Sequence, residues 1–414
     1  MLEARIISVG SEMMLGQLID TNAAWLSQRL AEIGVPVVEH ITVGDDQTRI
    51  EEALAGAAKP GTVVLVTGGL GPTEDDLTRH ALATVLEAPL ELHEASLDRI
   101  RDFFRSRGRK MADRNAIQAM FPYGSEPLEN PCGTAPGIRA RCGDAIIYVT
   151  PGVPREMKVM FERHVLPDLV SRSTGQVVVT ESLHCFGTGE SDIGQQISDL
   201  MQPGHQPAVG TRVDEGIISV RIVACGHLAE ARQKVAETAG IVEARLGTLI
   251  FGRGDETLAS AVGRLLQANG QTVAVAESCT GGLVAKWITD VPGSSAHFLG
   301  GVVAYANMAK QDLLGVQQQL IEIHGAVREP VARAMACGCR ERFGSDFALA
   351  VTGIAGPDGG TTDKPVGLVY IALADAGDCH VAEHRFGAHM DRHAIRRRTA
   401  SAALNMLRLH LLDR

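Results

Sequence analysis

The sequence predicts an α/β protein of three successive modules, because short apolar strands alternate with helical stretches in its first and last thirds. The alternation stops between them, where the order strand, helix, strands, helix indicates a small α+β module. A chain of 414 residues also has the length of two or three ordinary domains. We therefore expect modules at residues 1–172, 173–252 and 253–414.

The first module is expected to be a parallel sheet with ligand loops at the carboxyl ends of its strands. Its apolar segments RIISVG, VPVVEHITV, TVVLVTGG and DAIIYVTPG are each followed by a helical stretch. We expect helices at residues 20–33 and 48–58, a third helix that ends at Leu86, and a fourth that begins near Val153.

The two later modules are assigned by the same patterns. In the middle module, helices at 190–200 and 228–246 accompany the strands VVVTESLHCFG and IISVRIVACG. The last module opens with a helix that has a candidate N-cap at Asp255 and ends at Gly270. The strands QTVAVAES, FLGGVVAYA, FALAVTG and GLVYIALAD follow, and a final helix spans residues 392–412.

Composition excludes several classes of protein. The 49 acidic residues outnumber the 39 basic ones, which argues against nucleic acid as the main partner. The basic residues between 99 and 114 are interpreted as a solvated helix face, the alternative being a local phosphate site. With no apolar run of 18 residues and a strand rather than a signal peptide at the start, we expect a cytoplasmic protein without a membrane partner. The eight cysteines lack C-x-x-C spacing, which favours reduced thiols.

Ser278 ends a strand and begins the turn Cys279-Thr280-Gly281-Gly282, which leads into an apolar helix. The first amides of a helix have no internal acceptor, so they can bind a phosphate or stabilise an oxyanion. A lone serine at such a place would be interpreted as an ordinary helix cap.

Two further strand ends change that interpretation. One carries Tyr305 with Lys310 five residues later, and the other carries Thr352 and Gly353 in a Gly-rich loop. The carboxyl ends of neighbouring parallel strands meet at one edge of a sheet, and a desolvated lysine can activate a serine. No Ser-His-Asp order is evident, and the histidines at 297 and 324 are assigned to packing or to the surface.

The first module carries a second candidate site in the segment TGGLGPTEDD, which follows an apolar strand. Its glycines allow close approach of backbone amides to an anion, and its carboxylates could hold a cation that neutralises a diphosphate. The segment is neither a P-loop nor a G-x-G-x-x-G fingerprint. The residues expected to bind the ligand are Gly68, Gly69, Gly71 and Thr73.

The segments AESCTGG, AYAN-x-x-K, VTGIAGP and GLVYIAL resemble, in this order, the C-terminal domain of the CinA family of competence/damage-inducible proteins. The resemblance implies a hydrolase that deamidates nicotinamide mononucleotide without a cofactor, in the salvage of pyridine nucleotides. It implies the nucleophile Ser278 and the general base Lys310. The other implied site residues are Tyr305 and Thr352 as positioning or polarising groups, Arg392 as the family's late arginine with Arg396 as its substitute, and Cys279, Thr280, Gly281 and Gly353 around the substrate.

The first module is similar to the molybdopterin-binding fold as CinA proteins carry it. The resemblance rests on TGGLGPTEDDLT, Asn115, Gln118, GTAPG and PGVPRE. It implies a metal-dependent ADP-ribose pyrophosphatase that uses Mg²⁺, Mn²⁺ or Co²⁺. Asp45 and Asp76 are then the metal-binding or catalytic carboxylates, and Glu156 is a further candidate.

Two other functions remain open. The first module could be a pterin- or nucleotide-binding domain without turnover, or the whole chain could be an adaptor in competence or DNA repair. The middle module resembles the family's KH-like domain but has no Gly-x-x-Gly clamp with basic flanks. The resemblance also implies a homodimer.

Overall fold

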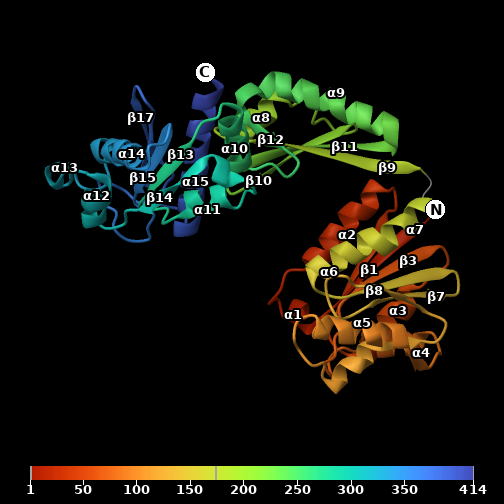
Figure 1. The fold of residues 1–414 in the computed structure, drawn as a ribbon. Helices are drawn as coiled ribbons and strands as arrows, with labels where there is room; N and C mark the ends of the chain where they lie inside the picture. The colour runs from red at the N-terminus through yellow and green to blue at the C-terminus, as the bar shows by residue number, and fades with distance from the viewer. Residues whose placement is uncertain (1, 173–174, 414) are drawn as a thin grey trace. The chain divides into compact units, whose positions relative to one another are not determined.

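The computed structural model describes residues 2–172 and 175–413 (Figure 1). The chain divides into two compact units, one made of Met1–Thr180 with Ala224–Lys234 and the other of Glu181–Val223 with Val235–Arg414.

The first unit contains a six-stranded sheet in the order β2-β1-β3-β8-β7-β6. The first four strands of this order are parallel, whereas β7 and β6 are antiparallel additions at one edge. The bounds are β1 Glu3–Val9, β2 Val37–Val43, β3 Thr62–Thr67, β6 Glu126–Leu128, β7 Gly137–Cys142 and β8 Ala145–Thr150. The sheet is therefore mixed rather than wholly parallel, because only two residues connect β7 to β8 and so short a turn joins antiparallel strands alone.

Helices cover both faces of this sheet. Helices α2 and α6 lie on one face and α3 and α4 on the other (Figure 1). Their apolar side chains pack in the two separate clusters that these faces form. The helices are α1 Ser11–Met14, α2 Thr21–Glu32, α3 Gln47–Ala57, α4 Thr78–Val85, α5 Glu94–Arg105, α6 Pro154–Met160 and α7 Leu166–Arg172; a small second sheet pairs β4 Leu90–Leu92 with β5 Met120–Pro122.

A four-stranded sheet in the order β10-β11-β9-β12 forms the middle of the chain. Its strands are β9 Gln176–Cys185, β10 Ala208–Asp214, β11 Ile217–His227 and β12 Ile250–Arg253, and its helices are α8 Glu190–Gln196 and α9 Leu228–Leu246. Strands β10 and β11 form a hairpin with an unbroken antiparallel register. The helix expected at 228–246 is confirmed, and strand β10 is an addition to the elements that the sequence predicted.

The last sheet has the order β14-β13-β15-β16-β17. Its strands are β13 Val273–Glu277, β14 Phe298–Val303, β15 Phe347–Gly353, β16 Leu368–Ala374 and β17 Cys379–Arg385. The first three in spatial order are parallel, and β16 and β17 add antiparallel to them. The carboxyl ends of β13, β14 and β15 therefore lie at one edge, as expected for the site residues that follow these strands.

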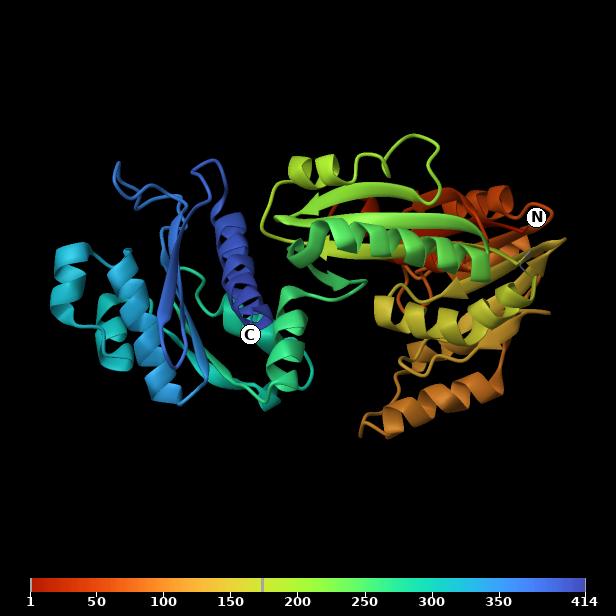
Figure 2. The ribbon, with the colours of Figure 1, turned by 90° about the horizontal axis from the view of Figure 1, so that it is seen from above.

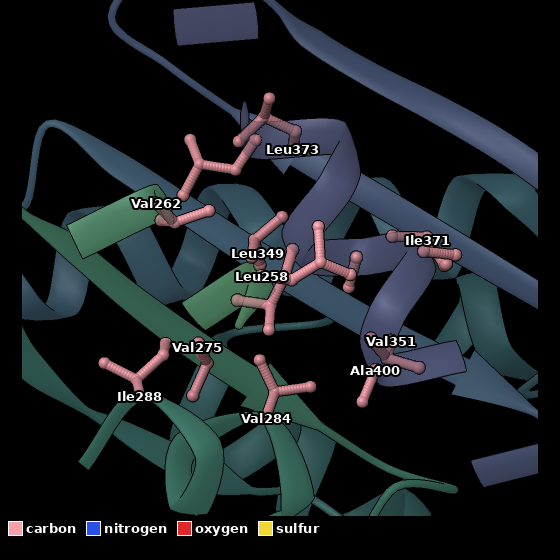
Figure 3. Packing of buried hydrophobic residues seen from close by; sticks show 14 of the residues in the cluster. Leu258, Val262, Val275, Val284, Ile288, Leu349, Val351, Ile371, Leu373 and Ala400 are labelled. Atoms are coloured by element: carbon pink, nitrogen blue, oxygen red, sulfur yellow. The ribbon is translucent and has the colours of Figure 1, made fainter. Parts of the chain in front are cut away.

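Two helical layers enclose this sheet, as Figure 2 shows with the sheet nearly edge-on. One layer contains α10 Leu258–Ala268, α11 Leu283–Thr289 and α15 Arg392–Leu412, and the other contains α12 Asn307–Leu314, α13 Gln318–His324 and α14 Glu329–Phe343. Figure 3 shows part of the first apolar core, where Leu258, Val262 and Val284 meet Val275 and Leu349 of the sheet.

The ends of two helices test the sequence-based assignments. The final helix spans Arg392–Leu412 as predicted, with the Asp391 side chain accepting the amide of Ala394. The N-cap assigned to Asp255 is wrong. The cap of α10 is Thr257, whose hydroxyl accepts the amide of Ser260 at 3.1 Å, because the helix begins two residues later than a cap at Asp255 would place it.

Candidate active site

Ser278 and Lys310 are in direct contact. The amine Nζ of Lys310 lies 3.1 Å from Oγ of Ser278, and it also donates to the carbonyls of Ala304 at 2.8 Å and Tyr305 at 3.2 Å. Ser278 follows β13 and Lys310 lies in α12, which follows β14, so the convergence of neighbouring strand ends brings the two together. Lys310 is only 1% exposed, and burial lowers its pKa. A lysine amine that loses its proton readily can accept the serine proton.

A buried carboxylate that the sequence interpretation missed holds the turn after Ser278. Glu277 is 1% exposed and accepts three amide hydrogen bonds, from Gly282 at 2.9 Å, Val284 at 3.1 Å and Ala285 at 2.8 Å. These amides belong to the first turn of α11, where a negative charge also meets the positive end of the helix dipole. The only sequence signal was a charged residue at the end of an otherwise apolar strand.

This carboxylate changes the expected oxyanion site. The start of α11 is already occupied by Glu277, and the amide of Gly281 bonds to the carbonyl of Ser278 at 3.1 Å. Within the described part of the chain, the amides of Cys279 and Thr280 have no hydrogen-bond acceptor. The set expected at residues 279–281 is therefore reduced to two donors, which is the number that a two-point oxyanion hole requires.

Cys279 is not a competing nucleophile. Its side chain is 6% exposed, and burial raises the pKa of the thiol to about 12. The thiolate is the reactive form of cysteine, so a thiol with this pKa stays protonated and inert near neutral pH.

Arg392 and Arg396 reach the site loops from the first two turns of α15. Arg392 donates to the carbonyl of Gly356 at 2.6 Å and to the hydroxyl of Tyr305 at 3.1 Å. Arg396 donates to the carbonyl of Thr280 at 2.6 Å, and its buried Nε has no partner among the described residues. Tyr305 is 61% exposed, which suits a ring that contacts a ligand. The structure thus brings both predicted arginines and the tyrosine to the loops around Ser278.

Thr352 and Gly353 are placed differently. The buried hydroxyl of Thr352 donates to the carbonyl of Ala326 at 2.8 Å, which fixes the segment before α14. At Gly353 an added Cβ would lie 2.6 Å from the side chain of Val369, so the close approach of β16 explains this glycine. Both residues therefore have a packing reason for their identity, and their contact with a substrate stays a prediction.

In the first unit, Asp76 organises the Gly-rich loop from inside. Its carboxylate accepts the amide of Gly71 at 2.7 Å, the amide of Thr73 at 2.9 Å and the hydroxyl of Thr73. The amide of Gly68 bonds to the carbonyl of Thr150. Of the four residues expected to present amides to a phosphate, Gly69 is the one whose amide has no acceptor within residues 2–172 and 175–413.

The neighbouring loops converge at the same edge of the sheet. The carboxylate of Asp45 accepts the amide of Ser11 at 2.8 Å, which joins the ends of β1 and β2. Buried Asn22 donates to the hydroxyl of Thr67 at 3.1 Å and to the carbonyl of Gly152 at 2.8 Å, which joins α2 to the ends of β3 and β8.

Arg79 is a residue of this unit that the sequence interpretation missed. It is fully buried in α4 and donates to the carbonyl of Leu70, and burial lowers its pKa to about 10. The nearby carboxylate of Asp76 opposes that shift in the pKa of Arg79.

The residues present do not form a metal site by themselves. In the part of the chain that the structure describes, no three His, Cys, Asp or Glu side chains lie together as possible metal ligands. The carboxylate of Asp76 already accepts hydrogen bonds from the Gly-rich loop, and Glu156 accepts the side-chain amide of Asn130 at 2.6 Å. Any divalent cation would need most of its oxygen ligands from a bound phosphate or from water, as is usual for Mg²⁺.

The basic residues between 99 and 114 lie mainly on the exposed side of α5 and in the segment after it. Arg101 and Arg105 form ion pairs with acidic residues of the same helix. Arg99 alone of this group lines a cavity of about 370 Å³ between α5 and residues 127–136. The arrangement supports a solvated helix face.

The fold and these two sites define an α/β protein with a candidate site in each of its end domains, the second built around a Ser–Lys pair. Three family models match the chain: a probable molybdopterin binding domain over residues 5–171, a damage-inducible protein CinA KH domain over 180–252, and a CinA C-terminal domain over 255–411. The chain therefore belongs to the CinA family.

Curated relatives match over nearly the whole chain. A CinA-like protein of Geobacter sulfurreducens is 47% identical over 98% of both chains, and a putative competence-damage inducible protein of Symbiobacterium thermophilum is 44% identical over 99% of both. Among solved structures, the competence/damage inducible protein CihA from Agrobacterium tumefaciens is 44% identical, with a TM-score of 0.36, over 37% of this chain and 93% of its own. None of the described helices is long and apolar enough to cross a membrane.

Replacing Glu277 by Gln should destabilise the C-terminal domain by about 2 kcal/mol, because hydrogen bonds to a charged group are replaced by weaker ones and an amide NH₂ faces backbone donors. Thermal unfolding of the full chain would measure the change. Glu341→Gln, at an exposed position of α14, removes the same charge and is the matched control. An unchanged unfolding temperature for the Glu277 variant alone would contradict the role assigned to this carboxylate.

Proposed function

We propose that the C-terminal domain hydrolyses nicotinamide mononucleotide to nicotinate mononucleotide and ammonia. The observation that carries this proposal is the contact between Lys310 Nζ and Ser278 Oγ at 3.1 Å, in a site where burial lowers the pKa of the lysine. A serine activated by a neutral amine attacks carboxylic amides, and the two free amides beside it suit the oxyanion that such an attack creates.

In the proposed reaction, Lys310 takes the proton of Ser278 as Oγ forms a bond to the carboxamide carbon. The amides of Cys279 and Thr280 bind the resulting oxyanion. Lys310 then gives its proton to the departing nitrogen, so ammonia leaves and an acyl-enzyme remains. Water attacks the ester with Lys310 again as base, which restores the serine and releases the carboxylate product. The overall reaction consumes one water molecule as its co-reactant and needs no cofactor.

The arginines of α15 support a substrate with a phosphate. Arg392 and Arg396 lie one turn apart on one side of the helix and contact different site loops. Arginine suits phosphate because its planar group donates two parallel hydrogen bonds. We assign the 5′-phosphate of the nucleotide to these two residues and its ring to the exposed face of Tyr305.

Ser278→Ala should lower the release of ammonia from nicotinamide mononucleotide by about 10³-fold or more, because it removes the attacking oxygen. Chromatography of the two nucleotides measures the reaction. Ser295→Ala, at an exposed serine of the same domain, should keep full activity. Normal turnover by the Ser278 variant, with an unfolding temperature equal to that of the wild type, would remove the serine from the mechanism.

The value of kcat/KM for this substrate should rise with pH through the lowered pKa of Lys310 and become constant above it. The active form is the neutral amine, so activity increases as the proton leaves, and the midpoint of the increase should lie below 10.5, the usual lysine pKa. Lys310→Arg, which stays protonated, should be inactive at every pH. A flat profile for the wild type would show that this lysine does not limit the reaction as a base.

For the N-terminal domain we propose binding of ADP-ribose, with hydrolysis to AMP and ribose 5-phosphate in the presence of Mg²⁺, Mn²⁺ or Co²⁺. The support is the convergence of the loops that contain Ser11, Asp45 and Gly69 at one sheet edge. Because the protein alone supplies few metal ligands, a binding domain without turnover is the alternative.

Asp76→Ala should abolish both binding and hydrolysis of ADP-ribose, because the Gly-rich loop loses the three hydrogen bonds that the carboxylate accepts. Calorimetry measures binding, and AMP formation with metal or with a chelator measures hydrolysis. The control is Asp144→Asn in the turn between β7 and β8. Binding of ADP-ribose by the wild type without AMP formation would show a binding domain without turnover. Unchanged binding and hydrolysis by the Asp76 variant would show that the site does not include this loop.

A further inference from the structure

The tip of the β10–β11 hairpin docks on the helix that carries the site arginines. Glu215 at this tip forms an ion pair with Nε of Arg397 in α15, and one of its oxygens lies 4.0 Å from His393. The adjacent Gly216 lies under the side chain of Arg398, since an added Cβ would be 3.0 Å from its Nε. All of these residues belong to the second compact unit.

The backbone at Glu215 lies in the left-handed region, which glutamate seldom adopts. Both turn residues have positive φ, 50° for Glu215 and 90° for Gly216, as a two-residue hairpin requires. Asn, Asp and Gly are the residues that adopt this conformation readily, whereas Glu adopts it at a cost. Here the longer carboxylate reaches α15 and forms the ion pair.

The periodicity of α15 separates two functions on its first turns. His393 and Arg397 are four residues apart and face the hairpin, whereas Arg392 and Arg396 are four residues apart and face the site loops. A contact that fixes the first pair therefore also fixes the rotation of the helix about its axis. That rotation sets where the second pair points.

Arg397 also connects the hairpin to the nucleophile segment. Its guanidinium lies over the ring of Trp287, 5.6 Å from the ring centre. Trp287 belongs to α11, the helix that begins directly after the Ser278 turn. Arg397 belongs to α15, the helix that also carries Arg392 and Arg396. Its side chain contacts both the hairpin tip and α11.

We propose that Glu215, through Arg397, positions Arg392 and Arg396 for the phosphate of the substrate. This assignment rests on the proposed deamidase activity and gives the middle module a role in it. Glu215 is a positioning residue, since it touches neither Ser278 nor Lys310 in the described structure. Its loss therefore affects substrate binding more than the chemical step.

The test is Glu215→Gln in the full chain. KM for nicotinamide mononucleotide should rise roughly threefold to tenfold with kcat within about twofold, as expected for a partly exposed ion pair coupled to a cation–π contact. Arg397→Gln should have a similar effect, and the double variant should be no worse than the more affected single one. Asp214→Asn, which removes the same charge one residue earlier in the hairpin, is the matched control.

Hydrogen exchange separates this proposal from the proposed activity. Amides of residues 391–398 should exchange faster in Glu215→Gln than in the wild type or in the Asp214 control, whether or not the substrate is right. If these amides exchange faster in Glu215→Gln but the wild type does not deamidate nicotinamide mononucleotide, the proposed activity is wrong and the role of Glu215 in fixing α15 still holds. Additive effects of the two single variants on KM, or unchanged KM and exchange, would overturn the positioning role.

Discussion

A single buried carboxylate, that of Glu277, fixes the geometry on which the C-terminal site depends. An ionised carboxyl group that is 1% exposed is tolerated only when hydrogen bonds replace its water, and three backbone amides do so here. They tie the end of β13 to the start of α11. Ser278 lies between these two elements, so its position is fixed by them. The amides at the positive end of α11 already bind Glu277 and are not available to another anion. Among the described backbone amides next to Ser278, those of Cys279 and Thr280 are the ones left without an acceptor, so they are the ones available to a negative charge there.

The environment of Lys310 complements this arrangement. Its three hydrogen-bond partners in the described structure are a hydroxyl and two carbonyls, all of them neutral. A buried ammonium without a carboxylate in hydrogen-bond contact loses its proton more readily than one in an ion pair, which agrees with the lowered pKa. The carbonyls of Ala304 and Tyr305 nevertheless aim the amine at Ser278. The protein thus orients this amine with neutral hydrogen-bond partners rather than with a carboxylate.

The sequence was most informative where a pattern is local or periodic. Alternating strands and helices predicted the α/β modules, and the final helix, expected roughly over residues 392–412, is confirmed. The pairing of Ser278 with Lys310 needed only the rule that parallel strands end at one edge. Glu277 was missed because its partners are backbone amides, which carry no sequence signal. The antiparallel edge strands and the packing reason for Gly353 depend on which strands become neighbours, and spacing along the chain does not specify that.

Both end domains use an acidic side chain to take up amides that would otherwise attract an anion. Asp76 does so in the Gly-rich loop and Glu277 does so at α11. Among the residues that the structure describes, Gly69 is the one of the four expected ligand-binding residues whose amide is left without an acceptor in the Gly-rich loop, and the amides of Cys279 and Thr280 are left without one beside Ser278. A loop with all of its amides free would bind many anions. A loop with one or two free amides binds an anion well only when a second set of donors reaches the same ligand. In the C-terminal domain that second set is the arginine pair of α15, whose orientation is constrained by a hairpin outside the domain. The proposed selectivity for a phosphate-bearing amide rests on these two constraints, which a substrate would have to satisfy at once.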